Sequence, residues 1–179
     1  MRITTGKYKG RVIKMPKGIR PTQNKVRKAL FDILGDIEGL SFLEFFSGSG
    51  AVGLEAVSRG VKKLVLVESD RTCQRALERN CESLNLRDFE LCAQQTDVAI
   101  QRFFKEKRCF DIIFLDPPYY KGMGKKTLQM LGAYDILAPN GFLVVQHFKK
   151  DDLPEALGDL RLLKRSSYAD TILSFYRKR

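Results

Sequence analysis

The 179-residue sequence lacks the features that metal sites, secretion and membranes require. His147 is its single histidine, and its four cysteines form no Cys-x-x-Cys pair, so the ligand spacing of a zinc site is missing. No apolar run approaches the ~18 residues that cross a bilayer. The N-terminal segment has no apolar stretch of the kind that secretory signals carry. We therefore expect a cytoplasmic protein with reduced cysteines and no metal.

Acidic residues are absent from the N-terminal segment. Residues 1–30 hold ten Lys and Arg and no Asp or Glu, whereas the remaining 149 residues hold 22 basic and 21 acidic groups. A solvated surface normally mixes both signs, so a segment of one sign indicates phosphate binding rather than a solubilising arm. The candidates for nucleic-acid binding are Lys7, Lys9, Arg11, Arg20, Lys25 and Lys28.

Hydrophobic periodicity predicts how the N-terminal segment folds. Alternation through residues 2–14 around Gly6 and Gly10 predicts a small basic hairpin. A helix follows, with Thr22 or Asn24 as its N-cap and Gly35 at its end. We predict that residues 1–35 form an RNA-binding extension and residues 36–179 the catalytic domain.

From residue 41 onward, strand patterns alternate with helix patterns. Strands are predicted at 41–46, 62–68, 89–94, 110–115 and 141–147, and helices at about 50–59, 70–84, 97–106, 124–134 and 152–157. Near-continuous apolar strands such as 64–67 indicate burial on both faces, hence a parallel sheet. Leu160–Leu163 and Thr171–Tyr176 are predicted to form a closing antiparallel pair. The fold class is therefore α/β, a doubly wound and mostly parallel sheet with an antiparallel C-terminal hairpin.

A glycine loop follows the first predicted strand of this sheet. Gly48, Gly50 and Gly53 fit G-x-G-x-x-G between a strand and a helix, the setting of a nucleotide-type cofactor. The next strand ends in Glu68, where a carboxylate can bind both hydroxyls of a ribose. Glu44 lies just before the loop. It suits the cationic amine of S-adenosylmethionine and would sit poorly beside the pyrophosphate of NAD, so S-adenosylmethionine is favoured.

Three further residues are candidates around the cofactor. Phe46 ends the first strand, and Asp97 follows the third, from where it can reach an adenine amino group or cap the next helix. Asn80 shares a helical face with apolar residues, so it must find hydrogen bonds in a structural network or on a ligand.

The tetrapeptide Asp116-Pro117-Pro118-Tyr119 ends the strand predicted at 110–115. Two prolines have no backbone N–H to give a sheet, so the strand stops there. Ligands of open α/β sheets bind at such carboxyl ends. A carboxylate and a carbonyl can both accept hydrogen bonds from one NH2 group, while an aromatic ring stacks on a flat base. The motif therefore indicates a site that holds an amino nitrogen for attack, although turn chemistry alone also explains two prolines.

These motifs together resemble a known family. Residues 44–50 look like methyltransferase motif I, and residues 116–119 look like motif IV of amino-methyltransferases. Residues 6–11, 20–22 and 26–31 resemble the bacterial small-subunit (16S) ribosomal RNA guanine-N2 methyltransferases of the RsmD type. This chain has Glu44 where the family more often has Asp, and Ala169 where the family's Tyr-Gly-Asp-Thr has glycine.

The resemblance implies an activity and a set of roles. It implies transfer of a methyl group from S-adenosylmethionine to guanine N2, with 16S ribosomal RNA in the small (30S) subunit as partner and a monomeric enzyme. By position it assigns cofactor contacts to Glu44, Gly48, Gly50 and Glu68. It assigns catalysis to Asp116, Pro117 and Tyr119. Arg20 becomes a candidate for closing over the cofactor or RNA.

Three other functions stay open at this level. A DNA adenine-N6 methyltransferase shares motif IV, but usually needs a large target-recognition insertion. A protein glutamine methyltransferase would more often have Asn at position 116. A non-catalytic RNA-binding assembly factor could use the same fold, although an intact Asp116 and glycine loop argue against it.

Overall fold

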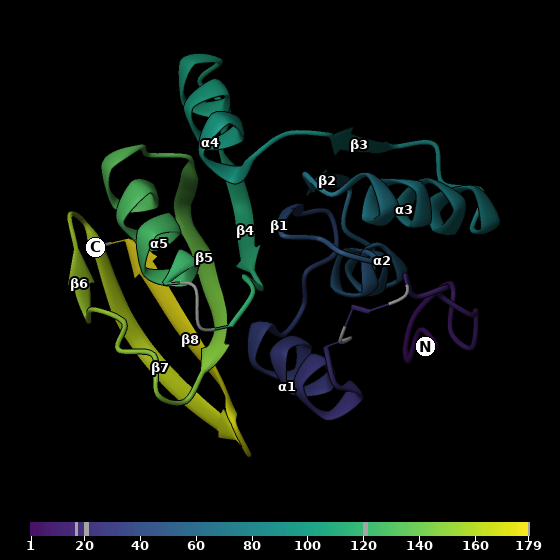
Figure 1. The fold of residues 1–179 in the computed structure, drawn as a ribbon, viewed down its shortest axis with the longest axis horizontal. Helices are drawn as coiled ribbons and strands as arrows, with labels where there is room; N and C mark the ends of the chain where they lie inside the picture. Colours follow the sequence, from purple (N-terminus) through teal and green to yellow (C-terminus); the bar gives the residue numbers. More distant parts are fainter. Residues whose placement is uncertain (17, 20–21, 120–121, 179) are drawn as a thin grey trace.

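A computed structural model gives the fold of the chain and describes residues 1–16, 18–19, 22–119 and 122–178. Within these residues the strands form one eight-stranded sheet in the order β3-β2-β1-β4-β5-β8-β7-β6 (Figure 1). The strands are β1 (Ser41–Phe45), β2 (Lys63–Val67), β3 (Phe89–Cys92), β4 (Phe110–Leu115), β5 (Leu137–Phe148), β6 (Ala156–Leu157), β7 (Leu160–Tyr168) and β8 (Thr171–Lys178). The helices are α1 (Asn24–Leu34), α2 (Ala51–Ser58), α3 (Arg71–Ser83), α4 (Thr96–Lys105) and α5 (Met123–Ala133).

The sheet confirms the predicted fold class. Strands β3, β2, β1, β4 and β5 pair in parallel, while β8, β7 and β6 add an antiparallel edge. Residues 64–67 of β2 are all buried, as their continuous apolar pattern predicts. The order in which strands are added to the sheet reverses between β1 and β4: β2 and β3 lie on one side of β1, and β4 and β5 lie on the other. This is the switch point where such sheets bind ligands.

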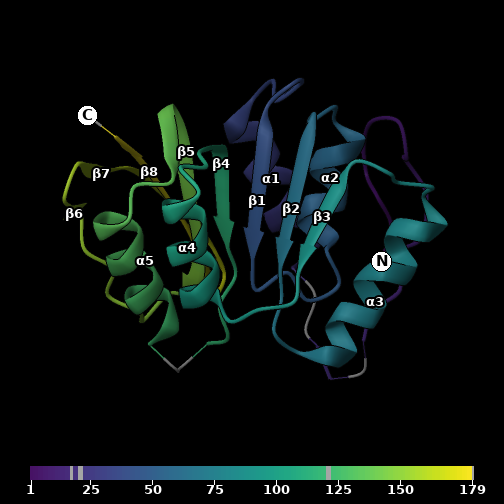
Figure 2. The same ribbon diagram turned by 90° about the horizontal axis from the view of Figure 1, so that it is seen from above.

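Helices cover both faces of the sheet (Figure 2). On one face, α1, α2 and α3 pack with the N-terminal segment around a core that includes Phe31, Phe42 and Phe114. On the other face, α4 and α5 pack around Phe45, Phe103 and neighbouring residues. The structure thus has two apolar cores separated by the sheet, as a doubly wound α/β fold requires.

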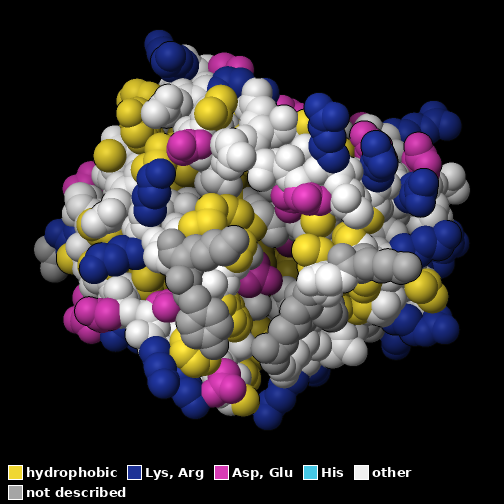
Figure 3. All heavy atoms as spheres, viewed as in Figure 1, with side chains coloured by type: hydrophobic (Ala, Val, Ile, Leu, Met, Phe, Trp, Pro, Cys, Tyr) yellow, Lys and Arg dark blue, Asp and Glu magenta, His cyan; other side chains and the backbone are white. Residues whose placement is uncertain are grey.

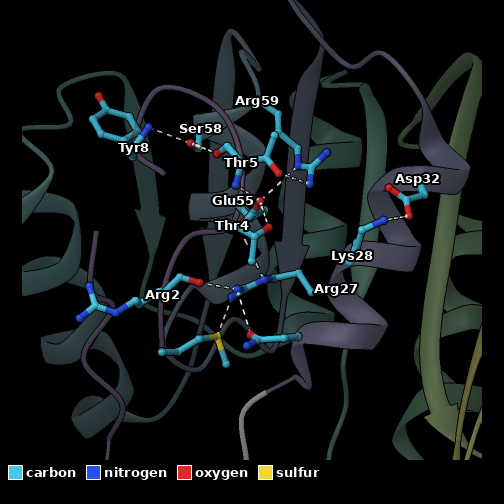
Figure 4. Close-up of polar contacts among 12 residues, drawn as sticks. Arg2, Thr4, Thr5, Tyr8, Arg27, Lys28, Asp32, Glu55, Ser58 and Arg59 are labelled. Atoms are coloured by element: carbon cyan, nitrogen blue, oxygen red, sulfur yellow. Dashed lines mark hydrogen bonds and ion pairs between the residues drawn. The ribbon is translucent and has the colours of Figure 1, made fainter. Parts of the chain in front are cut away.

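A buried ion pair fastens the N-terminal segment to the first of these faces (Figure 4). Arg27 of α1 lies 3.6 Å from Glu55 of α2 (Nε to Oε2), and both side chains are fully buried. Glu55 accepts hydrogen bonds from the backbone N–H groups of Thr4 and Thr5, and Arg27 donates to the carbonyl of Arg2. Each charge has further partners, and Glu55 also pairs with Arg59 at the end of α2, so the cost of burying the pair is offset.

Several local predictions need correction. Residues 152–157 form no helix, because Ala156–Leu157 pair with β7 as the edge strand β6. The hairpin predicted for residues 2–14 is reduced to turns closed by one antiparallel bridge between Arg2 and Val12. The N-cap of α1 is Gln23 rather than Thr22 or Asn24.

The side chains of Thr22 and Asn24 have other partners instead of a capping role, one distant in the sequence and one within α1. Thr22 donates to Asp116, and Asn24 accepts a hydrogen bond from Arg27.

Three of the four free cysteines, Cys73, Cys81 and Cys92, are buried. No helix among the described residues is both long and apolar enough to cross a membrane.

Candidate active site

The glycine loop and the Asp-Pro-Pro-Tyr segment open into one cavity. Phe45 at the end of β1 pairs with Leu115 at the end of β4, so the segments that follow leave the sheet side by side. Both segments line a cavity of about 680 Å³, within the size range of small-molecule sites. Figure 3 shows acidic side chains in the hollow near the middle of this face, beside hydrophobic ones.

The glycine loop fits closely against β1. Gly50 has a φ of +74°, the left-handed conformation that favours glycine, and it is the N-cap of α2. A Cβ at Gly53 would lie 2.7 Å from Oε2 of Glu44. Instead, the backbone N–H of Gly53 donates to that oxygen at 2.9 Å. Glycine at position 53 is therefore what allows Glu44 to lie under the loop.

Glu44 is a buried acid at the base of the cavity. Only 3% of its surface is exposed. Burial raises its pKa to about 8, a rise that the Gly53 N–H partly offsets and that the nearby carboxylates of Asp116 and Glu68 increase. A cationic group that enters the cavity would favour the ionised form of Glu44.

Glu68, at the end of β2, also lines the cavity. One carboxylate oxygen accepts from the backbone N–H of Gly48 at 2.8 Å, and the other accepts from the N–H of Asp70 at 2.8 Å. The side chain is therefore held at the mouth of the glycine loop, where its remaining lone pairs can accept hydrogen bonds from hydroxyl groups.

Asp116 is held by hydrogen bonds from two other segments. Thr22, just before α1, donates its hydroxyl to Oδ2 at 3.0 Å, and Gln146 of β5 donates its amide to Oδ1 at 2.9 Å. Burial raises the pKa of Asp116 to about 7, and the two hydrogen bonds oppose that rise. Like Glu44, Asp116 is an acid in a site that disfavours its charge.

The two other residues of the motif lie beside this carboxylate. Pro117 is buried and Tyr119 is half-buried, and both line the cavity. The hydroxyl of Tyr119 lies 2.9 Å from that of Thr171, and its ring centroid lies 5.8 Å from that of Phe148. The ring is therefore held at both its polar end and its edge.

The softer cofactor candidates separate into three outcomes. Phe46 lines the cavity with a φ of +57°, an uncommon conformation for a side chain other than glycine. Asp97 is not among the lining residues, whereas Gln95 is. Gln95 is also the N-cap of α4, and Asp97 lies in the first turn of that helix. Asn80 makes the structural network, since it binds both backbone groups of Lys14 and the carbonyl of Ser49.

The predicted basic residues lie on the surface, and they are not all near the cavity: the backbone N–H of Lys7 donates to Ser58 at the C-terminal end of α2, whereas the glycine loop precedes the other end of this helix. Lys7, Lys9, Arg11 and Lys25 are exposed, and Lys28 forms an exposed ion pair with Asp32. Arg20 lies outside the described residues. Figure 3 shows Lys and Arg side chains at the right-hand edge of the molecule, where Figure 1 places α3 and the N-terminus.

Sequence reasoning missed a row of basic residues on α3. Arg71, Arg75 and Arg79 are exposed and recur every four residues along α3, which places them on one face of the helix. Arg11 reaches the carbonyl of Ser83 at the end of α3, so this row adjoins the N-terminal segment. The four-residue spacing of the arginines was a signal that the sequence carried.

The contacts of Thr22 and Gln146 with Asp116 carried no such signal. Thr22 belongs to the segment 20–22 that resembles the family but was predicted only as a possible N-cap, and Gln146 belongs to no recognisable motif. Each contacts Asp116 from a distant part of the chain, 94 and 30 residues away. Gln146 follows the apolar run 142–145 of β5 and is buried, and a buried amide needs a hydrogen-bond partner, which is the hint that the sequence offers.

Comparison with known proteins gives consistent matches over the whole chain. A family model described as "Conserved hypothetical protein 95" matches residues 1–177. YlbH of Bacillus subtilis is 33% identical over the full length of both chains. "Ribosomal RNA small subunit methyltransferase D" of Buchnera aphidicola is 32% identical over 84% of this chain and 80% of its own.

Solved structures show the same architecture. Protein TTHA0928 of Thermus thermophilus superimposes with a TM-score of 0.86 and 34% identity, covering 99% of both chains. A more distant methyltransferase structure, SMU.776 complexed with SAH, has a TM-score of 0.65 and 16% identity over 85% of this chain and 48% of its own. At that identity the likeness concerns the fold.

Proposed function

Because the chain belongs to the "Conserved hypothetical protein 95" family, which includes the ribosomal RNA small subunit methyltransferases D, we propose that it methylates the N2 amine of a guanine in 16S ribosomal RNA. The methyl donor is S-adenosylmethionine, and the substrate is RNA within the small subunit or a late precursor of it. The enzyme would act as a monomer in the cytoplasm of a bacterium, where ribosomal subunits are assembled.

One observation carries this proposal. Asp116 at the end of β4 faces the same cavity as Glu44 and the glycine loop at the end of the neighbouring strand β1. A donor molecule held by the loop and an acceptor amine held by the aspartate would therefore meet inside a single cavity. Bringing two reactants together in this way is a large part of catalysis.

The residues present fit the donor. Glu44 and Glu68 can only accept hydrogen bonds when ionised. The amine and the ribose hydroxyls of S-adenosylmethionine donate them, and its positive charge complements the buried Glu44. The cofactor supplies a methyl group on a sulfonium, which is an electrophile. Glu44 would hold the amine and Glu68 the ribose. Gly48 and Gly50 would let the backbone of the loop lie close against the cofactor.

The acceptor side follows from the motif after β4. The carboxylate of Asp116 and the carbonyl of Pro117 would each accept a hydrogen bond from one N–H of the guanine amine. These two bonds would fix the direction of the nitrogen lone pair. Tyr119 would stack on the base, which must leave its helix to enter a cavity of this kind. Positioning and electrostatics then supply the rate, with no covalent nucleophile.

The RNA contacts would come from the basic surface beside the cavity. The N-terminal lysines and arginines and the row Arg71, Arg75 and Arg79 on α3 would bind phosphates. Such contacts fix orientation on the RNA without reading its sequence. The base itself would be identified inside the cavity.

The test is methyl transfer from labelled cofactor into undermethylated small subunits, followed by nucleoside digestion. We expect N2-methylguanine as the product. Asp116→Asn, which keeps the volume of the side chain, should lower turnover by at least about 100-fold, while Asp88→Asn, an exposed acid away from the cavity, should not.

Other outcomes would contradict the proposal in distinct ways. N6-methyladenine as product would indicate an adenine methyltransferase. Absence of S-adenosylmethionine binding in equilibrium measurements would indicate a non-catalytic RNA-binding factor. Unchanged turnover in the Asp116→Asn protein would remove the aspartate from the mechanism.

A further inference from the structure

Gln146 is a buried polar residue whose amide nitrogen has a hydrogen-bond partner and whose amide oxygen has none among the described residues. Its surface is 5% exposed, and it lines the cavity. The Nε2 group donates to Asp116, but Oε1 has no hydrogen-bond partner within the part of the chain that the structure describes. A buried acceptor without a partner costs free energy, so Oε1 is positioned to accept a hydrogen bond from a donor group of a molecule bound in the cavity.

The contact with Asp116 fixes which way the amide faces. An ionised carboxylate can only accept hydrogen bonds, so Gln146 must turn its NH2 group toward Oδ1. Thr22 donates to the other carboxylate oxygen, Oδ2, so the two donors do not compete for one oxygen of Asp116. Oε1 is thus held as an acceptor next to the acceptor Asp116.

The register of the sheet brings the two side chains together. Leu115 of β4 pairs with Val145 of β5, so Asp116 and Gln146 are the next lateral neighbours. Neighbouring residues of paired strands project from the same face of a sheet. The cavity therefore presents two hydrogen-bond acceptors side by side.

Guanine matches such a pair. On its Watson–Crick edge it carries two adjacent donors, N1–H and the N2 amine, whereas N1 of adenine has a lone pair and accepts. We infer that Gln146 is a specificity residue whose Oε1 accepts the N1–H of the target guanine while Asp116 holds the N2 amine. This inference rests on the proposed guanine-N2 activity and adds the group that recognises the base.

The inference predicts discrimination between bases that share the reacting amine. 2-Aminopurine has the N2 amine, but a lone pair at N1 would face Oε1. Once the target nucleotide is mapped, small subunits can be reconstituted with guanine, 2-aminopurine or hypoxanthine at that position. The wild-type enzyme should prefer guanine to 2-aminopurine by at least about 100-fold in kcat/KM, because a site built to receive an N–H rejects an analogue without it.

Gln146→Leu should abolish most of this preference. Leucine has a similar volume and no acceptor, so the ratio between guanine and 2-aminopurine should fall to within about fivefold. Total activity should also fall, since Asp116 loses a partner. Thr22→Val is the matched control: it removes the other hydrogen bond to Asp116, so it should slow both substrates together and leave the ratio unchanged.

The outcomes separate this inference from the proposed function. N2-methylguanine as product with an unchanged ratio in Gln146→Leu would show that Gln146 only positions Asp116, and would overturn the inference alone. Methyl uptake into hypoxanthine, which has no N2 amine, would overturn the proposed function. Cofactor binding and thermal unfolding of each variant distinguish these results from misfolding.

Discussion

At the scale of single residues, the protein holds two acids in positions that oppose their ionisation. The pKa of Glu44 is raised to about 8 and that of Asp116 to about 7, in both cases mainly by burial. Groups with such shifts are concentrated at functional sites. Both carboxyl groups face the cavity, so a hydrogen-bond donor or a positive charge that enters it would lower these pKa values again.

We predict that Glu44 makes stability depend on pH. Its pKa rises from 4.5 to about 8 on folding, so the folded state holds a proton that the unfolded state releases in this window. Stability from this group is therefore present at low pH and lost as pH rises toward 8. The free energy of unfolding, measured with urea, should therefore differ between pH 5 and pH 8, and Glu44→Gln should reduce this difference by about 2–4 kcal/mol.

The same variant should bind S-adenosylmethionine at least about tenfold more weakly, because a neutral amide replaces the charge that faces the amine. Isothermal titration at pH 8 measures this. Glu82→Gln, an exposed acid on α3, should change neither the pH dependence nor the affinity. An unaltered pH profile in Glu44→Gln would show that Glu44 is not the group that titrates.

The residue scale also shows the limit of sequence reasoning about the site. The structure brings Glu44, Glu68 and Asp116 to one cavity, and motif spacing predicted that arrangement because each acid ends a strand of a parallel sheet. Thr22 and Gln146 are not acids at the end of a predicted strand, so motif spacing does not point to them. Their position beside Asp116 depends on strand register and on the path of the N-terminal segment, which local patterns do not encode.

At the scale of elements, the β7–β8 hairpin carries a strained turn. Tyr168 pairs with Thr171, so Ala169 and Asp170 form a two-residue turn, and Ala169 has a φ of +55°. The related family has glycine at this position, and the structure gives the reason. An L side chain in the left-handed region costs about 1–2 kcal/mol.

We therefore predict that Ala169→Gly stabilises the protein. Relief of the strain outweighs the greater backbone freedom of glycine in the unfolded chain, with a net gain of about 0.5–1 kcal/mol, or about 1–4 °C in Tm. Thermal unfolding measures this. Ala156→Gly in the exposed strand β6 should instead be neutral or destabilising, and a lower Tm for Ala169→Gly would show that the turn is not strained.

Elements with strong periodicity were predictable, and those without were not. The apolar strands β1, β2 and β4 and the intervening helices lie close to their predicted bounds, because burial on both faces leaves a continuous apolar signal. The prediction for segment 152–157 was wrong. Its leucines matched a short helix, whereas hydrogen bonds to β7 hold the end of it as an edge strand.

At the scale of the whole molecule, charge is separated. Acidic side chains line the cavity, while exposed basic residues cover the N-terminal segment and one face of α3, whose N-cap Asp70 lines the cavity. A polyanion attracted to this surface would bring its bases to the mouth of an acidic cavity that repels its phosphates. The composition predicted the basic footprint of the N-terminal segment, but the contribution of α3 depends on tertiary packing.

We predict that RNA affinity falls steeply with salt. Each phosphate contact contributes a slope of about −0.7 to −0.9 in a plot of log K against log salt concentration. Substitution of both Arg75 and Arg79 by Gln should reduce the magnitude of the slope by about 1–2. Filter binding of 16S ribosomal RNA between low and physiological salt measures it.

The control for this prediction lies at the opposite end of the sheet. Lys62 and Lys63 are exposed at the start of β2, away from the carboxyl ends of the strands, and their substitution by Gln should leave the slope unchanged. Equal effects of both pairs would mean that RNA binding follows net charge and not the surface beside the cavity.

The buried pair between Arg27 and Glu55 has a consequence for how this protein can evolve. Deletion of the first 35 residues would remove the hydrogen bonds of Glu55 to Thr4 and Thr5 and its ion pair with Arg27, and would leave Arg59 to pair with this buried carboxylate. The N-terminal segment, which we propose binds RNA, is therefore not an exchangeable module. New substrates would more readily arise by substitution on the existing scaffold, because recombination that exchanged this segment would also destabilise the domain to which it is bonded.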